Sequence, residues 1–112
     1  MQTNTVSDLV RELFSAYRSG DRKVVENLLS DDFTFTSPVD DHIDKATYFE
    51  RCWPNHRSIK DHDIEKLFDR DNEVFVRYLL HKEDGKRFRN TEFFTVEGDK
   101  IKSVEVYFGA DA

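Results

Sequence analysis

One strand-like segment carries polar side chains at positions where its pattern calls for apolar ones. In residues 86–97, alternate positions form two rows, because successive side chains of a strand point to opposite faces. The more apolar row should face the core, and it consists of Phe88, Asn90, Glu92, Phe94 and Val96. Asn90 and Glu92 therefore lie in the middle of an apolar face. Burial of a carboxylate raises its pKa toward the range that is useful for acid–base catalysis.

Two explanations of this polar pair stay open. Glu92 could be a catalytic acid or base, with Asn90 orienting either Glu92 or a substrate. Alternatively, Glu92 forms a structural ion pair with a cation in the core, or the two rows face the other way.

The elements that must position this strand begin with three helices. Apolar residues at helical spacing predict the first helix over residues 6–17. Asp21 caps a second, short helix that ends at residues 30–32. The third helix begins after Asp44 and ends at Trp53, because the proline that follows disfavours helical dihedral angles in the residue before it.

Strands account for most of the remaining chain. Residues 33–36 alternate as a short strand, and an acidic loop follows. From residue 59 onward the pattern predicts strands at about 59–69, 73–82, 86–97 and 100–109, joined by turns short enough for antiparallel neighbours. The expected fold class is α+β, with three helices packed on one strongly curved antiparallel sheet.

Composition and charge restrict the possible functions. The 112 residues are a single-domain length, so one domain is expected over residues 1–112, and 13% aromatic residues argue against disorder. A net charge of −6 without a basic cluster argues against nucleic-acid binding. We find no signal-peptide pattern and no apolar run of the roughly 20 residues that span a bilayer, so no membrane partner is expected. The single cysteine, Cys52, favours a reducing cytoplasm.

The histidines and the cysteine do not indicate a metal or a covalent site. In a strand, Asp61 and Asp63 share one face while His62 points to the other, so the three side chains do not chelate together. The four histidines lack ligand-like spacing, and no metal is expected. A Cys52–His56 nucleophile is disfavoured because a proline interrupts the helix between them.

The chain also resembles the nuclear transport factor 2-like superfamily, in its SnoaL-like and ketosteroid-isomerase-like branch. The resemblance covers nearly the whole sequence. It rests on the order and spacing of five segments: residues 19–21 (SGD), 31–38 (DDFTFTSP), 92–96 (EFFTV), 98–101 (GDKI) and 104–109 (VEVYFG).

This resemblance implies a cystatin-like α+β cone, in which the helices close a bent sheet around a deep apolar pocket. Enzymes of this branch, among them polyketide cyclase-like proteins, act on small apolar molecules with pocket carboxylates. They isomerise, cyclise, dehydrate or open epoxides without a redox cofactor, so no cofactor is expected. Many members are homodimers joined through the outer sheet face.

Carried over residue by residue, the ketosteroid isomerase site is only partly present. The tyrosine that donates to the substrate oxygen falls on Leu13, and the aspartate base falls on Ser37. The second acid falls on Glu92. Asp40, in the acidic loop after Ser37, could replace the base from a shifted position, or it could simply be solvated.

The residues expected to contact a ligand include polar side chains that could form hydrogen bonds and apolar side chains that would line the pocket. Packing alone would also explain the tyrosines and the tryptophan among them. The full set is Asn90, Tyr17, Ser37, Trp53, Tyr78, Phe94, Val106 and Phe108.

Three functions follow as hypotheses. The first is an isomerase, cyclase or lyase that uses Glu92, with Asp40 as a second candidate carboxylate. The second is a pocket that binds a small apolar ligand without chemistry, which the missing groups at Leu13 and Ser37 favour. The third is a dimeric interaction domain that uses the outer sheet face, where Phe75, Leu79 and Phe93 would be exposed.

Overall fold

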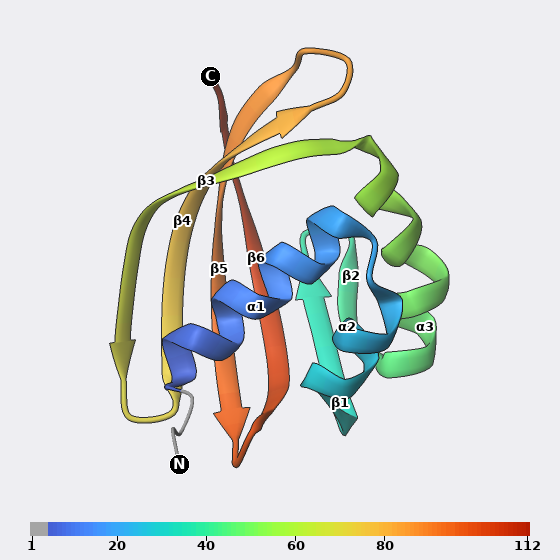
Figure 1. The fold of residues 1–112 in the computed structure, drawn as a ribbon, viewed down its shortest axis with the longest axis vertical. Helices are drawn as coiled ribbons and strands as arrows, with labels where there is room; N and C mark the ends of the chain where they lie inside the picture. The colour runs from blue at the N-terminus through green and yellow to red at the C-terminus, as the bar shows by residue number, and fades with distance from the viewer. Residues whose placement is uncertain (1–4) are drawn as a thin grey trace.

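A long helix lies across one face of a curved sheet, and two shorter helices follow beside it (Figure 1). The structure is a computed structural model that describes residues 5–112. The helices are α1 (Val6–Ser19), α2 (Arg22–Leu28) and α3 (Lys45–Arg51), and a 3-10 turn, η1 (Trp53–Ser58), follows α3. No helix within the described residues is long and apolar enough to span a bilayer.

The ends of α1 are fixed by local chemistry. The Thr5 hydroxyl accepts a hydrogen bond from the backbone N–H of Asp8 at 3.1 Å, and the Asp8 carboxylate accepts one from the backbone N–H of Thr5. This reciprocal capping box satisfies two amides that have no partner inside the helix. Gly20 ends the helix with φ 75°, a left-handed conformation that glycine adopts without strain.

Six strands form the sheet, in the order β2-β1-β6-β5-β4-β3. Every neighbouring pair is antiparallel except β1 and β6, which are parallel. The predicted α+β class, with three helices on a curved antiparallel sheet, is confirmed, except that β1 and β6 pair in parallel. The strands are β1 (Leu29–Ser37), β2 (Asp40–Asp44), β3 (Ile59–Arg70), β4 (Glu73–Lys82), β5 (Arg87–Glu97) and β6 (Lys100–Asp111).

The acidic loop predicted over residues 40–44 is wrong, because these residues form β2. Phe35 of β1 pairs with Ile43 of β2 across a tight hairpin. The strand occupies an edge of the sheet, where the exposed side chains of Asp41 and Asp44 discourage pairing with another chain. Because its sequence is mostly polar, the apolar alternation that predicts a strand is absent from it.

Other boundaries also differ from the predictions, since α1 ends at Ser19 and β6 ends at Asp111, two residues later than predicted in each case. The strand β1 begins at Leu29, so residues 30–32 lie in the strand instead of separating it from α2. The helix α3 ends at Arg51, and Pro54 lies at the start of the 3-10 turn. The proline does end the α-helix, but two residues earlier than expected.

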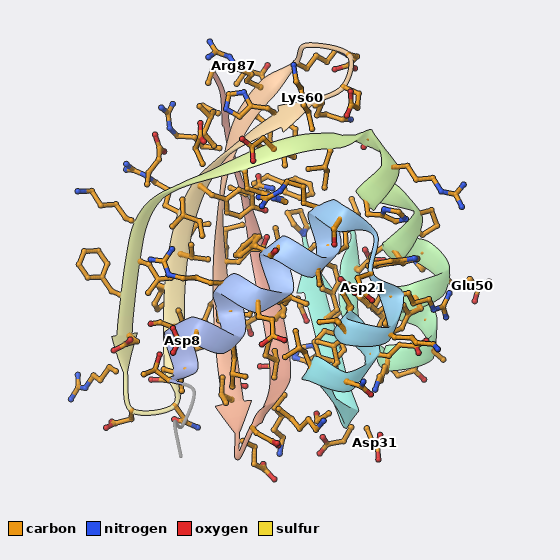
Figure 2. All side chains as sticks on the ribbon, in the orientation of Figure 1. Asp8, Asp21, Asp31, Glu50, Lys60 and Arg87 are labelled. Carbon is orange, nitrogen blue, oxygen red and sulfur yellow. The ribbon has the colours of Figure 1, made fainter. Side chains whose placement is uncertain are left out.

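The core lies between α1 and the inner face of β4, β5 and β6. The alternating rows predicted for these strands are confirmed, since Val74, Val76, Phe94 and Val96 are buried while Phe75 is half exposed. Labelled charged residues such as Asp31, Lys60 and Arg87 lie at the periphery (Figure 2). Register shifts in the β3–β4 and β5–β6 pairs accompany the bending of the sheet.

Adjacent phenylalanines of β5 provide a test of this face assignment. Phe94 is fully buried, whereas Phe93 lies on the other face, part-exposed and stacked on Phe75 with 4.6 Å between ring centroids. We expect Phe94→Ala to lower the free energy of unfolding by about 3–5 kcal/mol, because it leaves a cavity in the core. Phe93→Ala should cost less than half as much. Urea unfolding measures both, and equal losses would contradict the assignment.

Candidate functional site

A cavity of about 530 Å³ opens between the inner face of the sheet and the helices α1 and α3. This volume is within the range typical of small-molecule sites. Most of its wall is apolar, with a few polar side chains that come from several elements. The apolar lining consists of Leu13, Phe14, Phe35, Val39, Tyr48, Ile59, Leu80, Phe88, Val106 and Phe108.

Glu92 lies on the wall of this cavity, on the central strand β5. The Tyr78 hydroxyl, on the neighbouring strand β4, donates a short hydrogen bond to Oε2 of Glu92. The Asn90 amide donates to the Tyr78 oxygen at 3.3 Å. Among residues 5–112 no cation pairs with Glu92, so the predicted alternative of a structural ion pair finds no support in this part of the chain.

Burial raises the pKa of Glu92 to about 7, and the hydrogen bond from Tyr78 opposes that rise. The carboxyl group is deeply surrounded by protein, which accounts for the desolvation. Its side chain nevertheless keeps some accessible surface because it borders the cavity. A carboxyl group with a pKa near neutrality exchanges protons in both directions at physiological pH.

Two tyrosines of the cavity, Tyr78 and Tyr17, remain protonated donors. Burial and the adjacent Glu92 carboxylate raise the pKa of Tyr78 well above its usual value. Burial also raises the pKa of Tyr17, whose hydroxyl donates to the Cys52 carbonyl at 2.8 Å. Tyr17 thereby joins α1 to the end of α3, while its ring borders the cavity.

A second carboxylate, Asp40, reaches the cavity from β2. Its side chain is only 7% exposed, and its Oδ1 atom pairs with Arg51 of α3 at 2.7 Å. The Ser37 hydroxyl donates to the other oxygen, Oδ2, at 3.4 Å, and the Cys52 sulfur lies 4.0 Å from the same oxygen. The expectation of a solvated side chain therefore applies to the neighbouring Asp41, which is 90% exposed, and not to Asp40.

The structure brings eight of the predicted site residues together around the cavity. Trp53 and Phe94 do not border it. Trp53 lies in η1 and packs behind Tyr17, with 5.4 Å between ring centroids. Phe94 is fully buried beneath Phe14 of α1. The eight that do line the cavity are Tyr17, Ser37, Asp40, Tyr78, Asn90, Glu92, Val106 and Phe108.

His62 of β3 is a cavity residue that the sequence analysis did not select. Its ring packs edge-on against Phe14 and Tyr78, with centroid distances of 5.0 and 5.3 Å. Burial, with a smaller contribution from the nearby Arg18, lowers the pKa of His62 to about 4. Strand alternation had placed His62 opposite Asp61 and Asp63, and that alternation was the signal that it faces inward.

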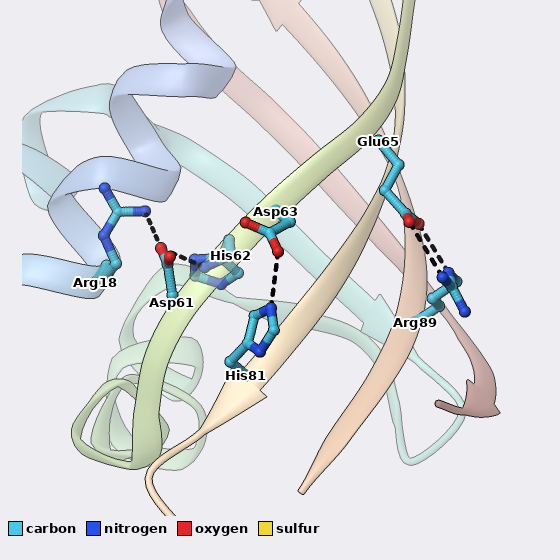
Figure 3. A network of polar contacts seen from close by, with 7 residues as sticks. All are labelled: Arg18, Asp61, His62, Asp63, Glu65, His81 and Arg89. Carbon is cyan, nitrogen blue, oxygen red and sulfur yellow. Dashed lines mark hydrogen bonds and ion pairs between the residues drawn. The ribbon is translucent and has the colours of Figure 1, made fainter. Parts of the chain in front are cut away.

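The charged neighbours of His62 are engaged in contacts of their own, and Asp61 also accepts a hydrogen bond from the backbone N–H of His62 at 2.8 Å (Figure 3). Asp61 pairs with Arg18 at 3.3 Å, and Asp63 pairs with His81 at 2.8 Å. Within residues 5–112, no three side chains of the metal-binding types converge on one point.

The comparisons with known proteins agree on one fold. The family model described as a SnoaL-like domain matches residues 10–104. An NTF2-like protein of unknown function from Cytophaga hutchinsonii is 27% identical, with a TM-score of 0.76 over 96% of this chain and 94% of that one. No curated protein matches the sequence.

Two further solved structures share the fold at lower identity. A de novo designed protein with a curved β-sheet has a TM-score of 0.80 at 16% identity, covering 96% of this chain and 88% of that one. A protein with a ketosteroid isomerase-like fold from Catenulispora acidiphila, solved with trimethylamine, has a TM-score of 0.74 at 14% identity, covering 94% and 88%. The chain belongs to the SnoaL-like domain family, within the nuclear transport factor 2-like superfamily.

Proposed function

We propose that this protein is an enzyme that binds a small apolar molecule and transfers a proton within it through Glu92. The observation that carries the proposal is a carboxyl group on an apolar cavity wall, without a paired cation among residues 5–112 and with a pKa of about 7. Isomerisation, cyclisation and elimination all need a base that takes a proton from carbon and an acid that returns one. Such a carboxyl group performs both roles.

The contacts of Glu92 suit this exchange. In the ionised form, Oε2 accepts the Tyr78 hydrogen bond and the other oxygen is left to take a proton. Asn90 donates to Tyr78 and so fixes the direction of that hydroxyl. When Glu92 becomes protonated, the Tyr78 hydroxyl no longer has a charged acceptor, and the proton returns readily to the substrate.

Asp40 is the second carboxylate in this proposal. It borders the same cavity, and Arg51 balances its charge. Asp40 also pairs with Ser37 across the β1–β2 hairpin, so it lies beside the position where ketosteroid isomerases have their base. We propose that it handles the second proton of a two-proton reaction.

A ligand-binding protein without catalysis is the second candidate. Leu13 and Ser37 stand where a catalytic tyrosine and aspartate would be expected, while the cavity itself is preserved. The trimethylamine bound by the Catenulispora relative supports a small organic ligand in either case.

We also propose that the protein forms a homodimer through the outer sheet face. Phe75 and Tyr107 are 50% and 54% exposed there, and Phe93 stacks on Phe75. Exposed aromatic groups that gather on one face favour an interface.

A generic probe tests the catalytic role of Glu92. A base removes the ring proton of 5-nitrobenzisoxazole, the N–O bond breaks, and the coloured cyanonitrophenolate appears. We expect the wild-type protein to accelerate this reaction, with a rate that rises through a pH of about 7 as Glu92 ionises. Glu92→Gln should lower the rate about 100-fold or more, because the amide cannot accept the proton.

The matched control is Glu73→Gln, which changes an exposed carboxylate of β4 and should leave the rate unchanged. Asp40→Asn distinguishes the roles of the two carboxylates. Because the probe reaction needs only one proton transfer, we expect Asp40→Asn to lower its rate far less than Glu92→Gln does. A Glu92→Gln variant as active as the wild type would refute the catalytic role. Binding of the probe without turnover in the wild type would favour the second candidate.

The dependence of stability on pH tests the pKa of Glu92. Its folded-state pKa of about 7 lies above the usual 4.5, so the folded state binds the proton more tightly than the unfolded state does. This stabilisation is present below about pH 4.5 and is lost as the pH rises through 7. Relative to Glu92→Gln, the wild type should therefore lose about 2 kcal/mol between pH 5 and pH 8. Urea unfolding of both proteins measures this, and a constant difference would indicate an ordinary carboxyl group.

Light scattering tests the dimer. We expect Phe93→Asp to halve the molar mass of the wild-type protein, because it places a charge in the middle of the proposed interface. Val39→Asp, which changes an exposed residue of the β1–β2 turn, should leave the mass unchanged. A Phe93→Asp protein that is still dimeric, or a monomeric wild type, would exclude this interface.

A further inference from the structure

The His62 side chain is a polar group of the cavity that the proposed proton transfer does not use. Its ring lies against Phe14 of α1 and Tyr78 of β4, both in edge-to-face contact. Tyr78 is also the residue that bonds Glu92. His62 and Glu92 therefore present their polar groups around the same tyrosine.

The surroundings of His62 favour its uncharged form. Two aromatic rings pack on the imidazole, and Arg18 on α1 is close enough to disfavour a second positive charge. Asp61 would favour the charged form, but it is already paired with Arg18 at 3.3 Å. Burial outweighs that attraction, so the ring is neutral at physiological pH and carries one N–H and one bare nitrogen.

The position of the single N–H follows from the packing. The Nδ1 atom is enclosed by protein and has no hydrogen-bond partner among the described residues. An enclosed N–H without an acceptor costs more free energy than an enclosed lone pair, and it is rarer in proteins. The proton therefore resides on Nε2. The ring borders the cavity, and Nε2 is its remaining polar atom, so the N–H is available to a ligand.

We infer that His62 presents Nε2–H to the cavity as a hydrogen-bond donor for a neutral carbonyl oxygen of the ligand. This inference rests on the proposed function, because it names the class of ligand that the same cavity would bind. A neutral donor on an apolar wall suits an uncharged acceptor. Lys82 is the only lysine or arginine among the residues that line the cavity; it ends β4 and is partly exposed, so an anionic group would pair there instead.

A carbonyl oxygen at His62 would also serve the chemistry of Glu92. The carbonyl group acidifies hydrogens on the adjacent carbon, and Glu92 takes such a proton. The electron pair moves onto the carbonyl oxygen, where the Nε2–H bond stabilises the negative charge. When the enolate is conjugated, Glu92 delivers the proton to a different carbon and the carbonyl group re-forms, which completes an isomerisation with no oxidant or reductant required.

The tautomer of His62 is tested in the free protein by ¹⁵N NMR of the imidazole nitrogens. We expect the Nε2–H tautomer from pH 5.5 to pH 8, without a titration in that range. His81 of the outer face is the internal comparison, because its Nε2 atom contacts the Asp63 carboxylate at 2.8 Å. An Nδ1–H tautomer, or protonation of His62 near pH 6.5, would overturn the inference.

The ligand class is tested with 2-acetylnaphthalene, a neutral aryl ketone, and 2-isopropenylnaphthalene, in which a methylene replaces the carbonyl oxygen. We expect the wild type to prefer the ketone and to lower its carbonyl stretching frequency in the infrared spectrum. His62→Phe keeps the aromatic packing but has no donor, so the shift should vanish and the preference should fall about fivefold. His62→Gln restores an N–H donor and should recover part of both effects, while His81→Phe should change neither.

Failure of this inference is distinguishable from failure of the proposed function. Ketone binding does not require proton transfer, so Glu92→Gln should retain the infrared shift. A shift that persists in His62→Phe, or equal affinity of the wild type for the two probes, would overturn the role of His62 while leaving the Glu92 assay unaffected. Loss of the shift in His62→Phe together with a fully active Glu92→Gln would support a carbonyl-binding protein that is not this catalyst.

Discussion

The desolvation of a single carboxyl group on the cavity wall is the constraint from which the rest of the site follows. Glu92 lies on the central strand β5, where the inward row must be covered by α1, yet among residues 5–112 it has no cation partner and is held by the Tyr78 hydroxyl. A carboxylate in such a place is stabilised less than the acid, so its pKa rises to about 7. A paired cation would have stabilised the fold locally and removed this reactivity.

The cavity lies between the inner face of the curved sheet and the helices α1 and α3. Register shifts in the β3–β4 and β5–β6 pairs coincide with this curvature, and the parallel pairing of β1 with β6 brings the β1–β2 hairpin to the cavity. The two carboxylates consequently have different environments. Asp40 is neutralised by Arg51, whereas Glu92 is not neutralised by any cation in the described part of the chain. Two carboxyl groups whose environments differ in this way can take different roles in acid–base chemistry.

Alternation along the strands carried most of the information that the sequence provides about this site. It placed Asn90 and Glu92 on the inner face of β5, and it placed His62 on the face opposite Asp61 and Asp63 without predicting that it borders the cavity. The chemistry of His62 depends on an enclosed nitrogen without a hydrogen-bond partner among the described residues, which no sequence pattern reveals. The strand β2 was missed because an exposed edge strand needs no apolar row. Trp53 and Phe94 were expected at the ligand but pack behind Tyr17 and Phe14, since aromatic residues fit core and pocket patterns equally well.

The proposed catalysis depends on a pKa near neutrality for Glu92. A ¹³C NMR titration of its carboxyl carbon measures this pKa most directly. Labelled wild-type protein would be titrated from pH 3 to pH 9, with the Glu92 signal assigned by its loss in Glu92→Gln. We expect a midpoint near 7. In Tyr78→Phe the midpoint should be higher still, because the hydrogen bond that stabilises the carboxylate is gone. A midpoint near 4.5 in the wild type would contradict the account.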